Sequence, residues 1–293
     1  MSFFDPFNLL RTKKESIGKP PGTLAYSGGF SDVDIAIDII SYNKDGISIS
    51  PVEKQVNLPD VFKSAAKVED VFWINIVGLH NQEIIKSVGD FFDIHAMDLE
   101  DIVHVSQLSR ILNQKDYLFS TIKMIYLQES VIKHEHVSIL LINNIVITFQ
   151  ETPGDVFNHV RRILAVPDSF LRGKDSGYLF YSLLDSIVDE YIVVINDISI
   201  RFNEIEMQFI DKNNPIKDNL YRLRKELLYF SNSLMPLIES FKYFTSSDNQ
   251  FLTTDILPYY ADLNDHLNQI FGSLKAYKEM IDSLYDMHIS DVS

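Results

Sequence analysis

Polar side chains near the C-terminal end of the chain recur at the spacing of one helix face. Asp262, Asp265 and His266 lie three and four residues apart, and Glu279 and Asp286 continue the acidic pattern. Residues at these separations are neighbours on an α-helix. Carboxylate oxygens are the ligands that Mg²⁺ prefers, but the same spacing is typical of a solvated helix face. Spacing alone favours the solvated face.

A second acidic group lies in the first half of the chain. Asp98, Glu100 and Asp101 closely follow His95. Acidic residues near the start of a helix stabilise it through the helix dipole. The alternative is an oxygen-ligand patch for Mg²⁺, an ion that often needs only one or two carboxylates. Composition favours the helix-dipole interpretation for these residues. Asp185 lies on a later helical segment, and its spacing alone indicates an ordinary solvated helix face.

The segment His134–Glu135–His136 places two imidazoles on one side of a predicted strand, because alternate strand residues share a face. Two histidines on one face are a possible zinc-type arrangement, but metal sites of that kind need three or four ligands. No third ligand is evident beside them. We therefore favour an exposed, hydrophilic strand entrance next to Lys133.

The composition excludes several kinds of partner and chemistry. The chain has 293 residues and a formal net charge of −15, so nucleic acid is not an expected partner, because phosphate binding requires clustered Lys and Arg. It has no cysteine, which excludes disulfides and thiolate metal sites. Apolar residues make up 46% of the chain, enough to bury a substantial core.

The sequence contains no standard catalytic or targeting motif. It has no Gly-rich phosphate loop, zinc-protease pair, EF-hand loop or serine elbow. The N-terminus has no basic patch followed by an apolar segment, and no window reaches the roughly 18 apolar residues of a membrane span. We predict that the chain is not an enzyme and that it is soluble as given.

The hydrophobic periodicity and the positions of Gly and Pro divide the chain into three parts: an N-terminal arm (1–22), a mixed domain (23–176) and a long helical stalk (177–293). In the mixed domain we expect strands at 23–26, 35–42, 47–50, 72–77, 117–127, 137–142 and 145–150, and helices at 60–67, 82–92, 96–103 and 155–164. Strands and helices in this order predict an α+β class, with a layered αβα domain and a mixed sheet.

The stalk is predicted from apolar residues at three- and four-residue steps. Three such stripes are separated by Asn213-Asn214-Pro215 and by a polar loop at 245–249. Short polar turns between long helices indicate an antiparallel three-helix arrangement. The last helix begins near residue 255 and meets no Gly or Pro stop before Ser293. We expect it to continue into a segment that is absent from this chain.

Several segments taken together resemble the CorA family of magnesium and cobalt channels. Their order and spacing over about residues 19–293 make the resemblance specific. The segments are Lys19–Leu24 (the entry segment, which contains Pro-Pro-Gly-Thr and leads into the mixed domain), Trp73–His80 (strand), Phe91–Ile102 (the "LEDI" segment), Tyr178–Tyr191 (first stalk helix), Met235–Leu237, and Pro258–His266 (last helix).

The chain also departs from the family pattern. The family has Gln-Arg-Pro-Lys after the LEDI segment, whereas this chain reads Gln107-Leu108-Ser109-Arg110. The Arg that precedes the family's first aspartate in the last helix is Ala261 here. The family's two membrane helices and its Gly-Met-Asn tripeptide are absent.

The resemblance implies the cytosolic regulatory part of a divalent-cation channel, at the cell inner membrane and joined to it only through the absent helices. It implies homo-oligomeric, pentameric assembly, with regulatory Mg²⁺, or else Co²⁺, held between protomers by Asp101 of one and Asp262 of the next. Glu100 and Asp185 match acids near a second ion, and Asp286 matches an acid facing the ion path.

Two alternatives remain open at the level of sequence. One is a soluble helical scaffold that binds a protein partner through its stalk. The other is the zinc-transporting sister branch of the same superfamily.

Overall fold

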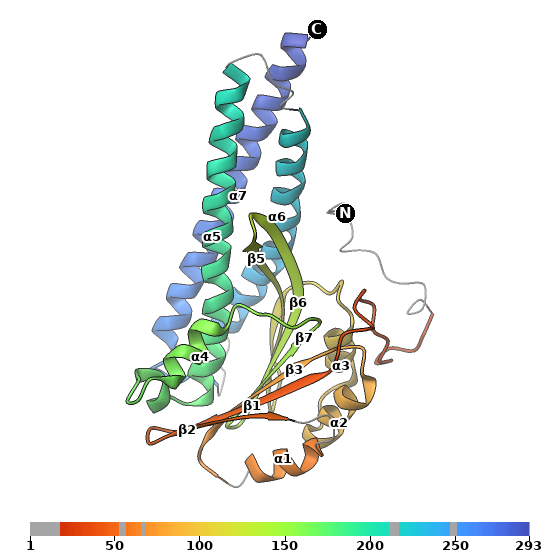
Figure 1. Cartoon of the computed structure of the whole chain (residues 1–293), viewed down its shortest axis with the longest axis vertical. Helices are drawn as coiled ribbons and strands as arrows, with labels where there is room; N and C mark the ends of the chain where they lie inside the picture. The colour runs from red at the N-terminus through yellow and green to blue at the C-terminus, as the bar shows by residue number, and fades with distance from the viewer. Residues whose placement is uncertain (1–17, 53–56, 66–67, 211–216, 247–250, 293) are drawn as a thin grey trace.

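The computed structural model describes residues 18–52, 57–65, 68–210, 217–246 and 251–292. A seven-stranded mixed sheet lies at the centre of the N-terminal half (Figure 1), in the order β2-β1-β3-β7-β6-β5-β4. Among the strand pairs of the described residues, β3–β7 is parallel and the others are antiparallel. The strands are β1 (Ala36–Tyr42), β2 (Ile47–Val52), β3 (Val71–Val77), β4 (Arg110–Asn113), β5 (Leu118–Gln128), β6 (Val131–Ile142) and β7 (Ile145–Gln150).

The sheet separates two hydrophobic cores, because successive strand side chains point to opposite faces. In β3, Trp73 belongs to one core and Ile74 to the other. One face is covered by α1 (Leu58–Ala65), α2 (Gln82–Phe92) and α3 (Ala96–Val103). The other is covered by α4 (Asn158–Ala165) and by the three long helices α5 (Ser176–Ile210), α6 (Lys217–Ser246) and α7 (Leu257–Val292).

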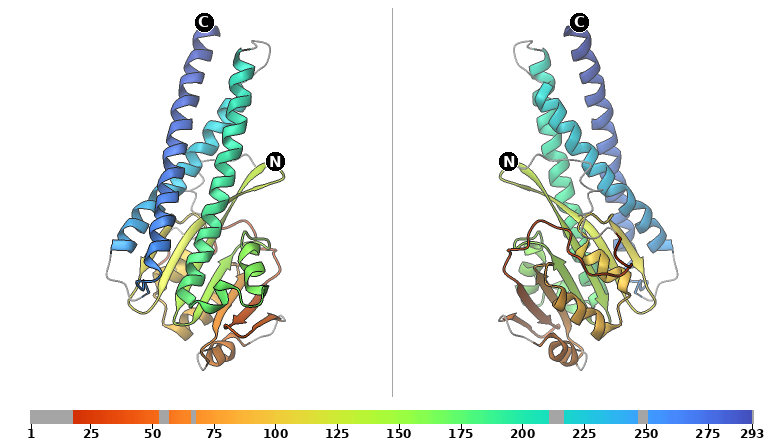
Figure 2. Two further views of the ribbon diagram at one scale, coloured as in Figure 1. Left: turned by 90° about the vertical axis from the view of Figure 1, so that its left-hand side faces the viewer. Right: turned by 90° about the vertical axis from the view of Figure 1, so that its right-hand side faces the viewer.

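The long helices pack side by side and extend beyond the same end of the sheet, and the chain runs one way along α5 and α7 and the other way along α6 (Figure 2). Their buried apolar residues belong to the same core as one face of the sheet, so the core is continuous from sheet to stalk. Arg201 pairs with Glu226 across α5 and α6 at 2.6 Å, and Arg224 pairs with Asp282 across α6 and α7 at 2.9 Å. Both ion pairs cross-link the stalk.

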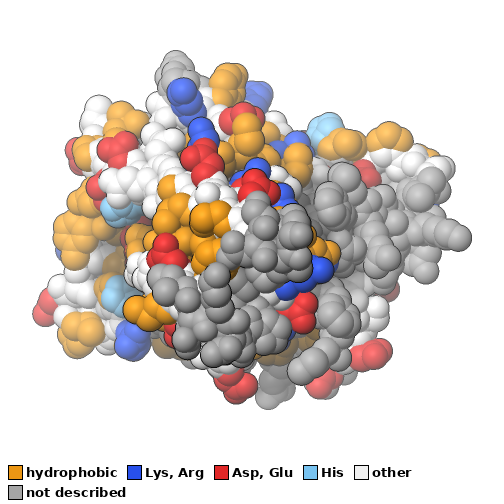
Figure 3. Space-filling model, turned by 90° about the horizontal axis from the view of Figure 1, so that it is seen from above, with side chains coloured by type: hydrophobic (Ala, Val, Ile, Leu, Met, Phe, Trp, Pro, Cys, Tyr) orange, Lys and Arg blue, Asp and Glu red, His pale blue; other side chains and the backbone are white. Residues whose placement is uncertain are grey.

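The end of the stalk presents a mixed surface. Met207, Met280 and Met287 are exposed there, and the view onto this end shows hydrophobic side chains interspersed with acidic and basic ones (Figure 3). Each helix among the described residues is too short or too polar to cross a lipid bilayer.

The expected α+β class, with a layered αβα arrangement and three long helices, is confirmed. The helices at 82–92 and 96–103 match α2 and α3. The strand expected at 23–26 is wrong, because a turn bonds the Thr23 amide to the Pro20 carbonyl at 3.3 Å and residues 23–26 form no strand. The short edge strand β4 was not predicted. The three-part domain division stays a prediction.

Candidate functional site

The predicted acidic group after His95 lies on α3. The His95 imidazole caps this helix by accepting from the Met97 amide. Asp98 is buried and accepts hydrogen bonds from the Tyr117 hydroxyl at 2.5 Å and from Gln114 at 2.9 Å. Asp98 therefore has a structural role that joins α3 to β5 and its preceding turn.

Glu100, next but one along α3, contacts the entry segment. One of its carboxylate oxygens accepts from the Gly22 amide at 2.7 Å. Gly22 has a φ of +82°, and a Cβ added there would lie 2.7 Å from the Ala96 Cβ. Only glycine meets both requirements without strain. The entry segment thus packs on α3, with the Gly22 backbone in close contact with the helix.

We expect Gly22→Ala to destabilise the protein by about 1–3 kcal/mol, because the new methyl group must displace the entry segment from α3. Gly18→Ala is the matched control. Gly18 has a similar φ of +83° but no atom within 4 Å of the added Cβ. Urea unfolding followed by circular dichroism measures both. Equal losses in the two variants would mean that the contact with Ala96 is unimportant.

Asp101 is the most enclosed of the predicted metal ligands. Its side chain is 7% exposed, and both carboxylate oxygens have partners: Arg110 pairs with Oδ2, and Gln107 donates to Oδ1 at 2.5 Å. Burial raises the pKa of this carboxyl, while Arg110 and Gln107 lower it. The two donors thus counteract the cost of burying the charge.

A buried polar network supports the same segment from the sheet. His136 on β6 donates from Nε2 to the Asp101 carbonyl at 3.0 Å, and the Lys123 ammonium on β5 donates to the Val105 carbonyl and lies 3.4 Å from His136 Nδ1. Burial lowers the Lys123 pKa to about 8. The expectation that His136 lies at an exposed strand entrance is wrong. Lys123 and His136 lie directly opposite each other in the β5–β6 pairing. Aligning the two strands of this hairpin in the sequence would have placed the two side chains together.

The other half of the predicted site lies on α5 and α7. Asp262 is 67% exposed in its side chain, with the His266 Nε2 atom 4.0 Å away. Asp185 is half-buried, and burial together with Asp189 raises its pKa to about 6, although the Tyr181 hydroxyl hydrogen-bonds to it. Asp262 also raises this pKa. The α5–α7 face therefore gathers negative charge from Asp185, Asp189 and Asp262, which His266 offsets in part.

Asp286 lies near the end of α7 and is exposed. Asp282, one turn earlier, is directed toward α6 by its pair with Arg224. The two acids therefore share a helix face at i and i+4, but Asp282 is engaged within the stalk.

The five predicted residues do not converge in one chain. Glu100 and Asp101 belong to the α3 layer, whereas Asp185 and Asp262 belong to the stalk layer on the opposite face of the sheet (Figure 1). Within the described ranges, no three His, Asp or Glu side chains are arranged to hold a metal ion. The donors are all oxygens, which suits Mg²⁺, and a dication would relieve the repulsion from Asp189 and Asp262 that adds to burial in raising the Asp185 pKa. The Asp185 and Asp262 carboxylates are ligands of the type that such an ion takes, whereas both oxygens of Asp101 are paired with Arg110 and Gln107.

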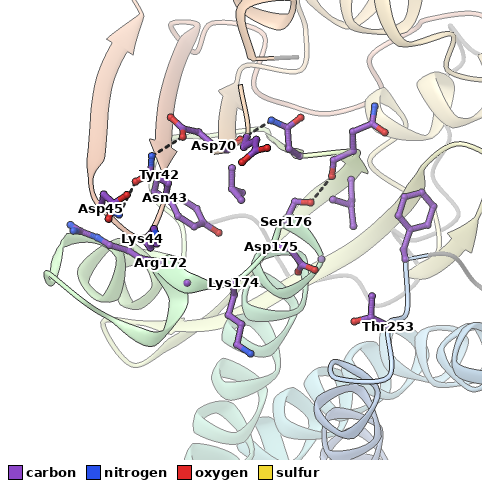
Figure 4. A pocket seen from close by; sticks show the side chains of 18 residues that line it. Tyr42, Asn43, Lys44, Asp45, Asp70, Arg172, Lys174, Asp175, Ser176 and Thr253 are labelled. Atoms are coloured by element: carbon purple, nitrogen blue, oxygen red, sulfur yellow. Dashed lines mark hydrogen bonds between the residues drawn. The ribbon is translucent and has the colours of Figure 1, made fainter. Parts of the chain in front are cut away.

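A cavity of about 650 Å³ lies elsewhere, where the β1–β2 and β6–β7 turns meet the start of α5 (Figure 4). None of the five predicted residues lines it. Its polar groups mostly hold the junction together: Arg172 donates to the Leu164 carbonyl, Asp175 caps α5, and Ser176 donates to the Asn143 carbonyl. The buried Tyr42 hydroxyl has no hydrogen-bond partner among the described residues. We assign this cavity a structural role between sheet and stalk.

Comparison with known proteins identifies the family. Residues 68–293 match the model of the CorA-like Mg²⁺ transporter protein family. The chain is 30% identical over 282 residues to the cobalt/magnesium transport protein CorA of Thermotoga maritima, covering 94% of this chain and 78% of the relative.

Two solved structures share the fold. The soluble domain of CorA from Methanocaldococcus jannaschii has a TM-score of 0.69 at 16% identity, covering 88% of this chain and 97% of that one. The ZntB cytoplasmic domain from Vibrio parahaemolyticus has a TM-score of 0.68 at 13% identity, covering 88% and 99%. From the family match and the Thermotoga relative, the chain belongs to the CorA-like Mg²⁺ transporter protein family.

Proposed function

We propose that this chain is the cytoplasmic regulatory part of a divalent-cation channel of the cell inner membrane, and that it senses Mg²⁺ at the interfaces of a homo-oligomer, a pentamer in the whole protein. One observation carries the proposal: Asp101 and Asp262 lie on opposite sides of the sheet in one chain. A site that uses both must therefore join two protomers, as cyclic assembly allows. The resemblance and the family support the same pairing.

The sensing mechanism follows from charge. In a ring, Asp262 and the half-buried Asp185 of one protomer face the α3 carboxylates of the next, Glu100 and Asp101. Without an ion these carboxylates repel one another, and a bound Mg²⁺ neutralises the repulsion and stabilises the interface. At high Mg²⁺ the ring is held closed, and at low Mg²⁺ it loosens. The ion acts as a regulator only if it binds the closed state more tightly.

Asp286 has a separate role in this proposal. Its place near the end of α7 suits an acid that faces the central passage and attracts cations toward it. The ion carried is Mg²⁺ or Co²⁺, the ions in the Thermotoga relative's name.

We expect Mg²⁺ to raise the thermal unfolding midpoint of this chain and to promote its assembly. Saturation at about 100 times the dissociation constant stabilises by about 2.7 kcal/mol. Asp262→Asn and Asp101→Asn should each remove most of this gain, since each deletes one ligand charge. Scanning calorimetry and sedimentation velocity, with and without Mg²⁺, measure both effects.

Asp168→Asn is the control for lost charge. Asp168 is exposed and has a φ of +55°, a conformation that asparagine also tolerates. It should respond to Mg²⁺ like the parent chain. If Mg²⁺ changes neither midpoint nor assembly of the parent, and both ligand variants behave like it, the sensor proposal is wrong.

The zinc-transporting branch is the second candidate, supported only by the fold likeness to the ZntB domain. The same thermal titration with Zn²⁺ in place of Mg²⁺ separates the two. The all-oxygen donor set predicts the larger response for Mg²⁺, whereas a zinc site would use imidazole or thiolate ligands.

A further inference from the structure

We infer that Arg110 is a tethered cation that competes with Mg²⁺ for Asp101 and so raises the Mg²⁺ concentration at which the interface site fills. The inference rests on the sensing role proposed above and adds a regulator to it.

The geometry brings Arg110 to Asp101 from a different element. Arg110 is the first residue of the edge strand β4, and its Nη2 atom pairs with Asp101 Oδ2. The start of β4 is anchored on the stalk, because the next amide, of Ile111, donates to the Ser240 hydroxyl on α6 at 3.1 Å. The sheet and the stalk together therefore hold the Arg110 guanidinium beside the Asp101 carboxylate.

Arg110 is the basic side chain that pairs with this carboxylate among the described residues. Lys123 lies beneath the same segment, but its ammonium donates to the Val105 carbonyl and faces His136. The Asp101 side chain is 7% exposed and that of Arg110 is 36% exposed. Mg²⁺ approaching a nearly enclosed carboxylate thus meets a positive charge already in place.

The guanidinium is held at one end only. Its Nε atom is buried and has no hydrogen-bond partner within the described ranges. Rotation away from Asp101 therefore breaks one ion pair and brings an unsatisfied donor toward solvent, which offsets part of the cost. The Arg110 guanidinium can therefore be displaced from Asp101 by a more strongly binding cation.

The guanidinium occupies Oδ2 of Asp101 and the Gln107 amide occupies Oδ1, and a dication beside the guanidinium is repelled in a weakly screened environment. Binding of Mg²⁺ then requires the unpaired form of Asp101. If that form is about one in ten of the population, the apparent affinity for Mg²⁺ is reduced about tenfold. Removing the charge of Arg110 should raise the apparent affinity for Mg²⁺ by the same factor.

The test is a Mg²⁺ titration of the whole chain, with the thermal unfolding midpoint as readout. In Arg110→Gln, we expect half-saturation at roughly three- to tenfold lower Mg²⁺ than in the parent, by the same population argument. Arg110→Met, which keeps the aliphatic stem without the charge, should behave in the same way, and it replaces the first variant if that one does not fold. Arg110→Lys, which retains a cation, should titrate near the parent.

Arg161→Gln is the matched control. Arg161 forms a comparable pair with Asp155 at 2.5 Å, with side-chain exposures of 27% and 5%, on the α4 side of the sheet. It should lower stability without moving the Mg²⁺ half-saturation point.

Two outcomes separate the proposals. If the parent responds to Mg²⁺ through Asp262 but the neutral Arg110 variants titrate at the parent concentration or higher, the competition is wrong and the sensor stands. If the parent shows no response to Mg²⁺ at all, both are wrong.

Discussion

Replacing Glu135 with glutamine is expected to flatten the pH dependence of stability between about pH 5 and pH 8. Glu135 on β6 is buried, and its carboxylate accepts from the Glu151 and Thr152 amides at 2.8 Å each and from the Thr152 hydroxyl at 3.0 Å. Burial, with a contribution from Glu151, raises its pKa from the ordinary 4.5 to about 7. The carboxyl therefore holds its proton in the folded protein at a pH where the unfolded chain has released it.

The sign of the effect follows from proton uptake. Between pH 4.5 and 7 the folded state binds more protons than the unfolded state, so the free energy of unfolding falls as pH rises. At about 1.4 kcal/mol per pKa unit, the total loss is on the order of 3 kcal/mol and is complete above the folded pKa. Glu135→Gln cannot ionise, so it should be more stable than the parent at pH 8 and similar at pH 5.

Chemical denaturation at a series of pH values measures the two profiles, and their difference isolates Glu135 from other groups such as Asp185. Glu129→Gln is the control, because Glu129 lies at the exposed β5–β6 turn and carries the same charge. Its profile should follow that of the parent. Parallel profiles for Glu135→Gln and the parent would contradict the assignment of a buried, proton-holding carboxyl.

Replacing His136 with alanine is expected to lower stability by about 2–4 kcal/mol and to weaken the response to Mg²⁺. His136 is 2% exposed. Its loss creates a cavity, leaves the Asp101 carbonyl without its donor, and removes the ring that faces Lys123. Because the segment after Asp101 is held by these contacts, the Asp101 carboxylate should also be less well positioned.

His136→Gln tests whether hydrogen bonding matters beyond packing. A glutamine amide donates and accepts, so it should recover part of the stability and of the Mg²⁺ half-saturation, whereas a purely space-filling role predicts no recovery of the titration. His159→Ala, on the exposed side of α4, is the control and should change stability by less than about 0.5 kcal/mol. Unfolding monitored through Trp73, the single tryptophan, combined with a Mg²⁺ titration, gives both quantities. An unaltered Mg²⁺ response in His136→Ala would show that the buried network does not position Asp101.

Local pattern predicted most of the elements, because their signals are short-range. The apolar steps of α7, with Leu263, Leu267 and Leu274 buried, follow directly from the helix period. The capped helices α2 and α3 were predicted with their observed bounds. The edge strand β4 was missed because four residues carry too little periodicity, and its strand character depends on pairing with β5.

The sequence by itself determined the class, the long amphipathic helices and, through resemblance, which acids to consider. Only the tertiary structure decided what those acids contact. Packing against the sheet places the α3 layer and the α7 layer on its opposite faces. The β4–β5 pairing brings Arg110 to Asp101, and the β5–β6 pairing brings Lys123 beside His136. These are contacts between elements, and no local spacing encodes them, because each depends on the register and burial that the whole sheet imposes.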